Sequence, residues 1–206
     1  MNILILGATG RVGRHIVNYA INDKHKVTVL VRTPDKIKLQ SKNLTIIHGN
    51  VLNEDDIVHA IQGIDIVISA LNTDGTTTLS ESMPLIIKAI ENEGIKRIIT
   101  VGTAGILQSR ITPSLLRYQS GESKQKSTRA AKEHHKVYEM LKQSNLEWTI
   151  VCPTYLPDGE RIGKYRINRG YLPENGVKIS VSDTAEFTFK QIKTSDYIKE
   201  RVGIAY

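Results

Sequence analysis

Short apolar runs alternate along the chain with longer segments in which apolar residues recur every three or four positions. The runs predict buried strands at 2–6, 26–31, 44–48, 64–69, 97–101, 147–151, 177–181 and 201–206. The segments with helical spacing predict helices at 12–21, from 53 onward, and at about 79–93, 128–144 and 183–193. This alternation predicts a single α/β domain over residues 1–206: a Rossmann-like, doubly wound, mainly parallel sheet with helices on both faces.

Two polar segments interrupt the alternation. Residues 107–127 are irregular and rich in serine, and a loop of this length inside a compact domain is more often functional than a linker. We therefore predict a lid there. Residues 158–176 are rich in glycine and charge, and we predict a substrate-side excursion from the sheet.

A glycine-rich turn follows the first predicted strand and runs from Gly7 through Gly10 to Gly13. In a βαβ unit the first glycine permits a tight exit from the strand, the second lets the backbone approach a pyrophosphate, and the third lets helix and strand pack closely. The N–H groups at the start of the helix then attract phosphates. The turn predicts a dinucleotide site, since a purely structural turn rarely needs all three glycines.

The residue that ends the second strand indicates which dinucleotide binds. Sites for NAD usually carry an acidic residue about 20 positions beyond the glycines. This chain has Arg32 there, with Thr33 and Lys36 close by. Because a guanidinium binds a phosphate bidentately, we predict NADP(H) as the cofactor, held at its 2′-phosphate by Arg32. A solvated surface arginine is the alternative.

The formal net charge of the 206 residues is +7, which raises the question of a nucleic-acid partner. The richest basic run extends from Lys124-Gln125-Lys126 to Lys136. It has no interleaved aromatic residues and matches no nucleic-acid-binding motif, so we predict no such partner. A solvated helix face and affinity for phosphate-bearing cofactors account for the charge.

The remaining composition excludes several classes of protein. No apolar stretch approaches the length of a membrane span, and the chain starts in a strand without a basic leader, so we expect no membrane partner and a cytoplasmic location. Cys152 is the single cysteine, which excludes a disulfide within the chain. No cluster has the spacing of metal ligands, and we predict no metal site. The oligomeric state stays open.

Several motifs fall in the order and spacing of one family. They are Gly7-Ala8-Thr9-Gly10-x-x-Gly13, Val31-Arg32-Thr33-Pro34, Gly49-Asn50-Val51, Ile68-Ser69-Ala70-Leu71, Gly102-Thr103-Ala104-Gly105 and Trp148-Thr149-Ile150-Val151-Cys152-Pro153. The chain resembles the atypical short-chain dehydrogenase/reductases, within them the small NAD(P)-binding, NmrA-like group that includes flavin reductase of the biliverdin reductase B type. The resemblance implies NADPH-dependent reduction of flavins, quinones or similar flat acceptors.

The resemblance also assigns roles to residues. It implies that the pyrophosphate is held by Gly7, Thr9, Gly10, Arg11, Val12 and Gly13. It implies contacts of Arg32 with the 2′-phosphate, of Asn50 and Val51 with adenine, and of Ala70 and Leu71 beside the ribose. Thr103 takes the place of the catalytic-region serine, close to the cofactor, and His134 that of a helix histidine. The chain departs from the family at Asn50, usually an aspartate, and at Cys152, often an arginine.

Two groups on the helix before the sixth strand compete as proton donor. Tyr138 and Lys142 match the Tyr-x-x-x-Lys spacing of short-chain dehydrogenases, but Lys142 lies in the last turn, away from the carboxyl ends of the strands where ligands bind. We predict that this match is a decoy. His134 lies in the first turns and on the inward stripe, so it is the better candidate, with a core histidine as the alternative.

Four further residues could contact a substrate, and two functions besides the predicted one stay open. Thr103 could donate a hydrogen bond to a substrate oxygen or be structural, and Tyr118, Pro153 and Tyr155 are candidates for walls of the acceptor pocket. We predict an NADPH-dependent reductase that transfers a hydride to a flavin, quinone or related flat acceptor. A non-catalytic NADP(H)-binding redox sensor is the first alternative, and an isomerase or dehydratase the second.

Overall fold

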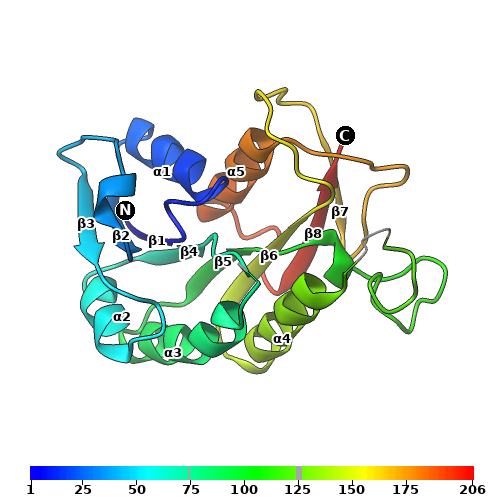
Figure 1. Ribbon diagram of the computed structural model, residues 1–206, viewed down its shortest axis with the longest axis horizontal. Helices are drawn as coiled ribbons and strands as arrows, with labels where there is room; N and C mark the ends of the chain where they lie inside the picture. Colours follow the sequence, from blue (N-terminus) through cyan, green and yellow to red (C-terminus); the bar gives the residue numbers. More distant parts are fainter. Residues whose placement is uncertain (74, 124–126) are drawn as a thin grey trace.

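The computed structural model describes residues 1–73, 75–123 and 127–206, and its framework is an eight-stranded sheet between two layers of helices (Figure 1). The strands are β1 (Asn2–Leu6), β2 (Lys26–Val31), β3 (Leu44–His48), β4 (Ile66–Ser69), β5 (Arg97–Val101), β6 (Glu147–Pro153), β7 (Arg166–Arg169) and β8 (Glu200–Ala205). The helices are α1 (Gly13–Asn22), α2 (Glu54–Ile61), α3 (Thr78–Asn92), α4 (Arg129–Gln143) and α5 (Val181–Lys190), with short 3-10 turns η1 (Pro34–Lys36), η2 (Ala104–Ile106) and η3 (Gln191–Lys193).

The strand order is β3-β2-β1-β4-β5-β6-β8-β7, and each neighbouring pair is parallel except β7 with β8. The order reverses beside β1, because the chain leaves β1 to build β2 on one side and returns to place β4 on the other. This confirms the predicted Rossmann-like, doubly wound, mainly parallel sheet. Ligands of such sheets bind at the carboxyl ends of the strands where the order reverses.

Two apolar cores hold the layers together. The core on one face packs α1 and α5 against the sheet, and the core on the other packs α2, α3 and α4 (Figure 1). Strand β1 is almost wholly buried between them, with Ile3 and Ile5 in one core and Leu4 and Leu6 in the other. The apolar run at the start of the sequence therefore forms a central strand, as expected for a parallel sheet covered on both faces.

The carboxyl-terminal third differs from the prediction. The expected strand at 177–181 is wrong: Lys178 makes only an isolated bridge with Tyr155, and helix α5 already begins at Val181. The buried Ile179 and Val181 gave the run its apolar character, and Ser180 ends it by accepting a hydrogen bond from the backbone N–H of Asp183 at the start of α5.

A strand that the pattern did not indicate lies inside 158–176. This strand, β7, runs antiparallel to β8 at the edge of the sheet, with the sequence Arg-Ile-Asn-Arg. Charged side chains are typical of edge strands but hide the apolar signal by which a strand is predicted. Strand β8 itself lies between β6 and β7, although β7 precedes it in the chain.

Residues 107–123 form a hydrogen-bonded unit beside the β7–β8 pair. The N–H of Gln108 donates to the carbonyl of Gly170 (2.8 Å), and the Arg110 side chain donates to the carbonyl of Leu172 (3.1 Å). Within the unit, Arg117 and Glu122 form a largely buried ion pair of 2.5 Å. The predicted lid at 107–127 stays a prediction, and these contacts fold its described part against the sheet edge.

Parts of two predictions lie outside the described residues. Lys124-Gln125-Lys126 belongs both to the basic run and to the predicted lid, and Asp74, after β4, is likewise outside the described residues. Among the residues that the structure describes, no helix is long and apolar enough to cross a membrane.

Candidate functional site

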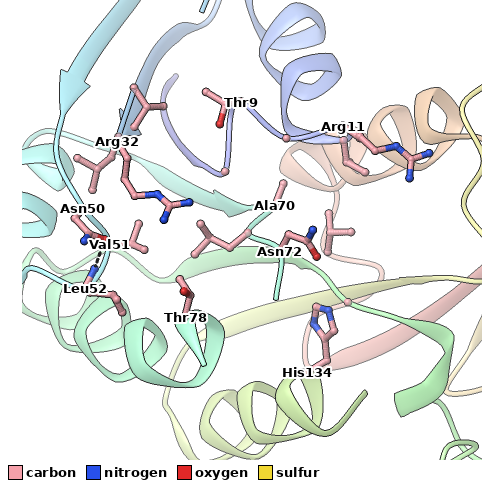
Figure 2. Close-up of a pocket in the computed structure, with 18 of the residues that line it drawn as sticks. Thr9, Arg11, Arg32, Asn50, Val51, Leu52, Ala70, Asn72, Thr78 and His134 are labelled. Carbon is pink, nitrogen blue, oxygen red and sulfur yellow. Dashed lines mark hydrogen bonds between the residues drawn. The ribbon is translucent and has the colours of Figure 1, made fainter. Parts of the chain in front are cut away.

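A cavity of about 440 Å³ opens where the strand order reverses (Figure 2). Its described walls comprise Gly7, Thr9, Gly10, Arg11, Val12, Leu30, Val31, Arg32, Gly49, Asn50, Val51, Leu52, Ala70, Leu71, Asn72, Thr78, Val101, Gly102, His134 and Leu156. These residues come from the carboxyl ends of β1, β2, β4 and β5, from the turns that follow β1 to β5, from the loop after β6, and from the first turns of α3 and α4. The structure thus brings together residues that are far apart in the sequence.

The glycine turn forms the floor of the cavity because side chains have no room there. Gly7 has a φ of +78°, a backbone conformation that other residues rarely adopt, and a Cβ atom on it would strike the carbonyl of Ala70. A Cβ on Gly13 would fall on the carbonyl oxygen of Gly7. Gly13 therefore lies against the turn rather than in the cavity wall, and it sets the distance between α1 and β1.

The amino terminus of helix α1 faces this turn, and no side chain among the described residues caps it. Its N-cap residue, Val12, has no side chain that could accept a hydrogen bond, and its first turn carries no acidic residue. Both features leave the positive end of the helix dipole uncompensated by the chain itself. A backbone cradle of this kind, which any Cβ would fill, suits a pyrophosphate.

One end of the cavity is formed by the turns after β2 and β3. In the view of Figure 2, the side chain of Arg32 extends into the cavity between Thr9 and Asn50. The side-chain oxygen of Asn50 accepts a hydrogen bond from the N–H of Leu52 (3.1 Å), and the Asn50 N–H donates to Asp56 in the first turn of α2 (2.8 Å). Asn50 therefore shapes this turn through its own oxygen.

Arg11 lines the cavity but already has partners. Its Nε donates to a carboxylate oxygen of Asp158 (3.0 Å) and its Nη2 to the carbonyl of Leu156 (2.8 Å), and Figure 2 shows the guanidinium directed away from Arg32. Both side chains of the Arg11–Asp158 pair are at least half exposed, so the pair contributes little free energy. A phosphate at the glycine turn would compete with Asp158 for this guanidinium.

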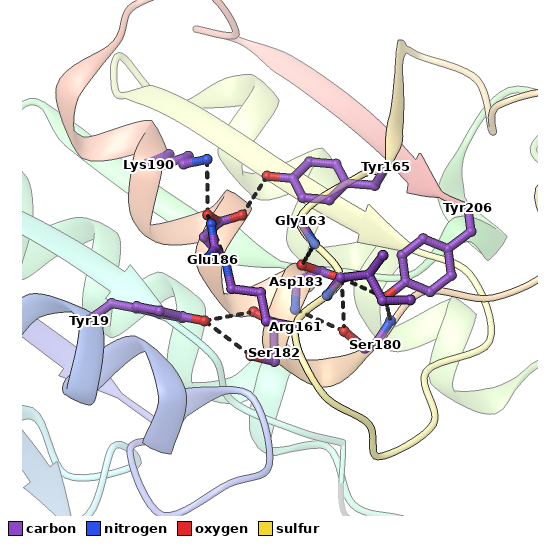
Figure 3. A network of polar contacts seen from close by, with 11 residues as sticks. Tyr19, Arg161, Gly163, Tyr165, Ser180, Ser182, Asp183, Glu186, Lys190 and Tyr206 are labelled. Atoms are coloured by element: carbon purple, nitrogen blue, oxygen red, sulfur yellow. Dashed lines mark hydrogen bonds and ion pairs between the residues drawn. The ribbon is translucent and has the colours of Figure 1, made fainter.

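The loop that contains Asp158 is anchored on helix α5 (Figure 3). Asp183, which is 0% exposed, accepts hydrogen bonds from the N–H groups of Ile162 (3.0 Å) and Gly163 (2.9 Å) and from the hydroxyl of Tyr206 (2.5 Å). Burial alone would raise the pKa of the Asp183 carboxyl, but these hydrogen bonds outweigh burial and hold its pKa below the usual value.

A second carboxylate of α5 fixes the same loop. Glu186 accepts from Arg161 (3.0 Å to Nε), from the hydroxyl of Tyr165 (3.0 Å) and from Lys190 (3.0 Å). The predicted excursion at 158–176 is therefore tied to α5 and to the sheet edge. Leu156, just before it, is the residue that reaches the cavity.

His134 lies at the other end of the cavity, on the first turns of α4 and below Asn72 in Figure 2. Burial lowers the pKa of His134 from 6.5 to about 4, and the neighbouring charge of Glu133 opposes this shift only partly. The imidazole is therefore neutral at pH 7. It can donate a hydrogen bond from its protonated nitrogen, but it does not carry the charge of an imidazolium.

This shift predicts a pH dependence of stability. Because the unfolded chain binds a proton at His134 below pH 6.5 and the folded chain does so only near pH 4, the free energy of unfolding should fall between these values and level off below them. Between pH 7.5 and pH 5, the free energy of urea unfolding should fall by about 2 kcal/mol less in His134→Asn than in wild type. His59→Asn, at an exposed position of α2, is the matched control and should keep the wild-type loss. An equal loss in all three proteins would contradict the assignment.

Besides Gly13, four predicted site residues lie outside this wall. Thr103 caps the η2 turn, where its side chain accepts a hydrogen bond from the N–H of Gly105 (3.4 Å), and Pro153 is buried at the end of β6. The hydroxyl of Tyr118 bonds to Nδ1 of His135 (2.8 Å), and Tyr155 is 62% exposed. None of the four is among the described residues that line the cavity, and their roles toward a ligand stay predictions.

Tyr138 and Lys142 occupy the end of α4 far from the cavity. The ring of Tyr138 packs edge-on against Trp148, the second residue of β6, and under the guanidinium of Arg201, the second residue of β8. Lys142 lies over the same ring at 5.8 Å. These contacts are at the amino ends of the strands, which confirms the predicted placement of the pair away from the ligand edge.

Sequence reasoning missed several residues of the wall. Asn72 belongs to the polar turn after β4, and Thr78 begins α3 directly after that turn. Ala70 and Leu71, which the resemblance places beside the ribose, come directly before Asn72, so the polar residues that follow them were the available signal. Leu156 had no such signal, because an apolar residue in a loop does not show where the loop folds. Among the described residues, no three His, Cys, Asp or Glu side chains gather as metal ligands.

Comparison with known families agrees with this geometry. Residues 7–195 match the model of a family described as NAD(P)H-binding. The chain belongs to the NAD(P)H-binding family. The match begins at the first glycine of the turn and extends through α5, so it covers every element that lines the cavity. An atypical short-chain dehydrogenase/reductase of the NmrA-like group fits this membership.

Two solved structures are similar to this chain over the whole fold. A candidate epimerase from Bacteroides thetaiotaomicron is 30% identical with a TM-score of 0.86, and the alignment covers 100% of this chain and 96% of that one. A candidate NADH-flavin reductase from Streptococcus pneumoniae is 27% identical with a TM-score of 0.83, covering 100% and 99%. Both are similar over their full length, and they differ in the reaction they are named for.

Among curated relatives, a photosystem II assembly factor from Synechocystis sp. is 34% identical over 106 residues, which is 48% of this chain and 32% of that protein. The matched region is thus about a third of the relative's length. The rest of that larger protein has no counterpart in the match.

Proposed function

We propose that the protein is an NADPH-dependent reductase that transfers a hydride to a flavin, quinone or related flat acceptor. The observation that carries this proposal is the single cavity that extends from Arg32, over the glycine turn, to His134. A guanidinium at one end, a backbone cradle in the middle and a neutral hydrogen-bond donor at the other match the successive parts of NADPH and its acceptor.

The residues divide the work along the cavity. Arg32 would bind the 2′-phosphate, and Asn50 and Val51 would border the adenine. The glycine turn with Thr9 and Val12 would hold the pyrophosphate, where the positive end of α1 favours negative charge. Ala70 and Leu71 would lie along the ribose and keep water away from it.

The acceptor end is formed by Val101, Gly102, Leu156 and His134. When bound, the cofactor supplies the hydride, and the chain supplies position, exclusion of water and a hydrogen-bond donor. Since His134 is neutral at pH 7, it would donate a hydrogen bond from its N–H to an acceptor atom that gains charge. The similarity to a candidate NADH-flavin reductase supports a flat acceptor.

The test of the function is NADPH oxidation by the purified protein against a panel of flavins, quinones and small carbonyl compounds. We expect turnover with members of the first two classes and little with the third. No turnover with any member, together with tight NADPH binding, would instead favour the redox sensor, to which the similarity to an assembly factor gives some support. Isomerisation without net NADPH loss would favour an epimerase.

The cofactor preference gives a separate prediction. Arg32→Ala should weaken NADPH binding by about 10–150-fold, because a charge-assisted hydrogen bond to phosphate contributes about 1.5–3 kcal/mol. The affinity for NADH, which lacks that phosphate, should change little. Arg14→Ala removes an exposed arginine of α1 outside the cavity wall and should leave both affinities unchanged. Equal affinity of the wild-type protein for NADPH and NADH would contradict the assignment.

A further inference from the structure

A buried carboxylate joins the two helices, α3 and α4, whose first turns line the cavity. Glu133, on α4, is only 4% exposed. Its Oε2 accepts hydrogen bonds from the side-chain hydroxyl of Ser80 (2.7 Å) and from the Ser80 backbone N–H (3.3 Å), and its Oε1 accepts from Lys136 (2.7 Å). Ser80 lies in the first turn of α3.

These bonds supply a helix cap from outside the helix. The N-cap residue of α3, Thr77, makes no capping hydrogen bond with its side chain, because its hydroxyl donates to Glu81 instead (2.5 Å). A backbone N–H of the first turn is therefore satisfied by Glu133, and the carboxylate lies at the positive end of the helix dipole. Burial would raise the pKa of Glu133, but the hydrogen bonds from Lys136 and Ser80 outweigh it, so the carboxylate is ionised at pH 7.

The helix start that Glu133 holds is part of the cavity wall. Thr78, the first residue of α3, lines the cavity, and so does His134, the residue that follows Glu133 on α4 (Figure 2). The other hydrogen bonds that we find at the start of α3 among the described residues are local to 73–81. In this part of the chain, Glu133 is thus the polar link between the two wall segments.

We propose that Glu133 is a positioning residue, which fixes the start of α3 against α4 and thereby holds the two wall residues Thr78 and His134 in register across the cavity. The inference rests on the proposed function for what His134 does there. Glu133 is thus a further residue of the proposed site. It lies outside the cavity, does not contact a ligand and acts through its neighbours. An error of about 1 Å in the placement of a reacting group can cost about 10²-fold in rate, so the loss of such a link should be visible in turnover.

Three substitutions distinguish an effect on the placement of the wall residues from an effect on the stability of the fold. Glu133→Ala removes the hydrogen bonds of this carboxylate with Ser80 and Lys136 and should lower kcat by about 10–100-fold. The affinity for NADPH should stay within about twofold of the wild-type value, because the substitution leaves the glycine turn and Arg32 unchanged. Glu133→Gln keeps an oxygen that can accept from Ser80 and should restore kcat to within about threefold. Glu139→Ala removes an exposed glutamate from the same helix and should leave kcat unchanged.

Two measurements on the same variants do not depend on turnover. Hydrogen exchange of the cofactor-free protein should become faster at 78–82 in Glu133→Ala and stay as in wild type in Glu139→Ala. The ring signal of His134 in NMR spectra should respond to NADPH in wild type and in Glu133→Gln, and should lose this response in Glu133→Ala.

The outcomes distinguish the inference from the proposed function. Folded Glu133→Ala with wild-type kcat, exchange and His134 response overturns the inference. A loss of kcat that only follows a lower folded fraction, and that Glu133→Gln does not restore, overturns it as well. If wild type turns over no acceptor, the proposed function fails, while faster exchange at 78–82 and the lost His134 response in Glu133→Ala still support the link.

Discussion

Replacing His134 by alanine is expected to lower kcat for NADPH oxidation by about 10²-fold or more. A fixed hydrogen-bond donor aimed at an atom that gains charge typically contributes about 10²–10³-fold, and His134 is the titratable side chain among the described residues at the acceptor end of the cavity wall. NADPH affinity should be measured alongside, because the imidazole also forms part of the wall. A kcat that stays at the wild-type value would mean that the proton comes directly from water, which a flavin-type acceptor allows.

The matched control is the tyrosine–lysine pair on the same helix. Tyr138→Phe and Lys142→Met should each leave kcat within a few-fold of wild type, because both side chains pack near Trp148 and Arg201 at the amino ends of the strands. If Tyr138→Phe abolished turnover while NADPH binding stayed intact, both the placement of α4 and the assignment of His134 would be wrong.

Gly13→Ala should destabilise the protein by about 3 kcal/mol and abolish NADPH binding. The new methyl group would fall on the carbonyl oxygen of Gly7, and both atoms belong to backbone, so no side chain can move aside. Relief requires α1 to separate from β1, which costs more than ordinary overpacking in a core. The cradle for the pyrophosphate would open at the same time, because Gly7 and Gly10 belong to the same turn. For a domain of this size, the expected fall in melting temperature is about 6–12 °C.

Gly159→Ala is the control for this experiment. A Cβ on Gly159 would lie 3.7 Å from Ser180, an ordinary contact, so the same chemical change should alter the free energy of unfolding by less than about 0.5 kcal/mol. Thermal unfolding and NADPH titration of both variants suffice. Wild-type stability and affinity in Gly13→Ala would show that the turn does not set the spacing of helix and strand.

The sequence predicted the amino-terminal part of the fold better than the carboxyl-terminal part. Strands β1, β2, β4, β5 and β6 are mostly buried and apolar, because the centre of a parallel sheet is covered on both faces. Strand β7 has a solvent-facing edge and carries two arginines, so it has no such signal. The run at 177–181 is apolar but forms no strand, because its buried residues, Ile179 and Val181, join the core under α5.

The cofactor side of the cavity could likewise be predicted more fully than the acceptor side. The glycines, Arg32 and Asn50 follow directly from strand ends, and a strand end has a fixed place in a parallel sheet. The acceptor side depends on where loops fold back. Leu156 reaches the cavity because its loop is held by Asp183 and Arg11, contacts between residues that are far apart in the sequence. Tyr155, one position earlier, points to solvent instead.

The position of β8 between β6 and β7 has a consequence for the order of assembly during synthesis. Strands β1 to β6 can pair as soon as they emerge, because each finds its neighbour among residues already made. Strand β7 pairs only with β8 among the described strands, so it must wait, exposed, until residue 205 has left the ribosome. The two arginines of β7 would keep this waiting segment from pairing with other nascent chains. The last 40 residues then close the sheet in one step, and the amino-terminal half, with its glycine turn, is already in place to receive them.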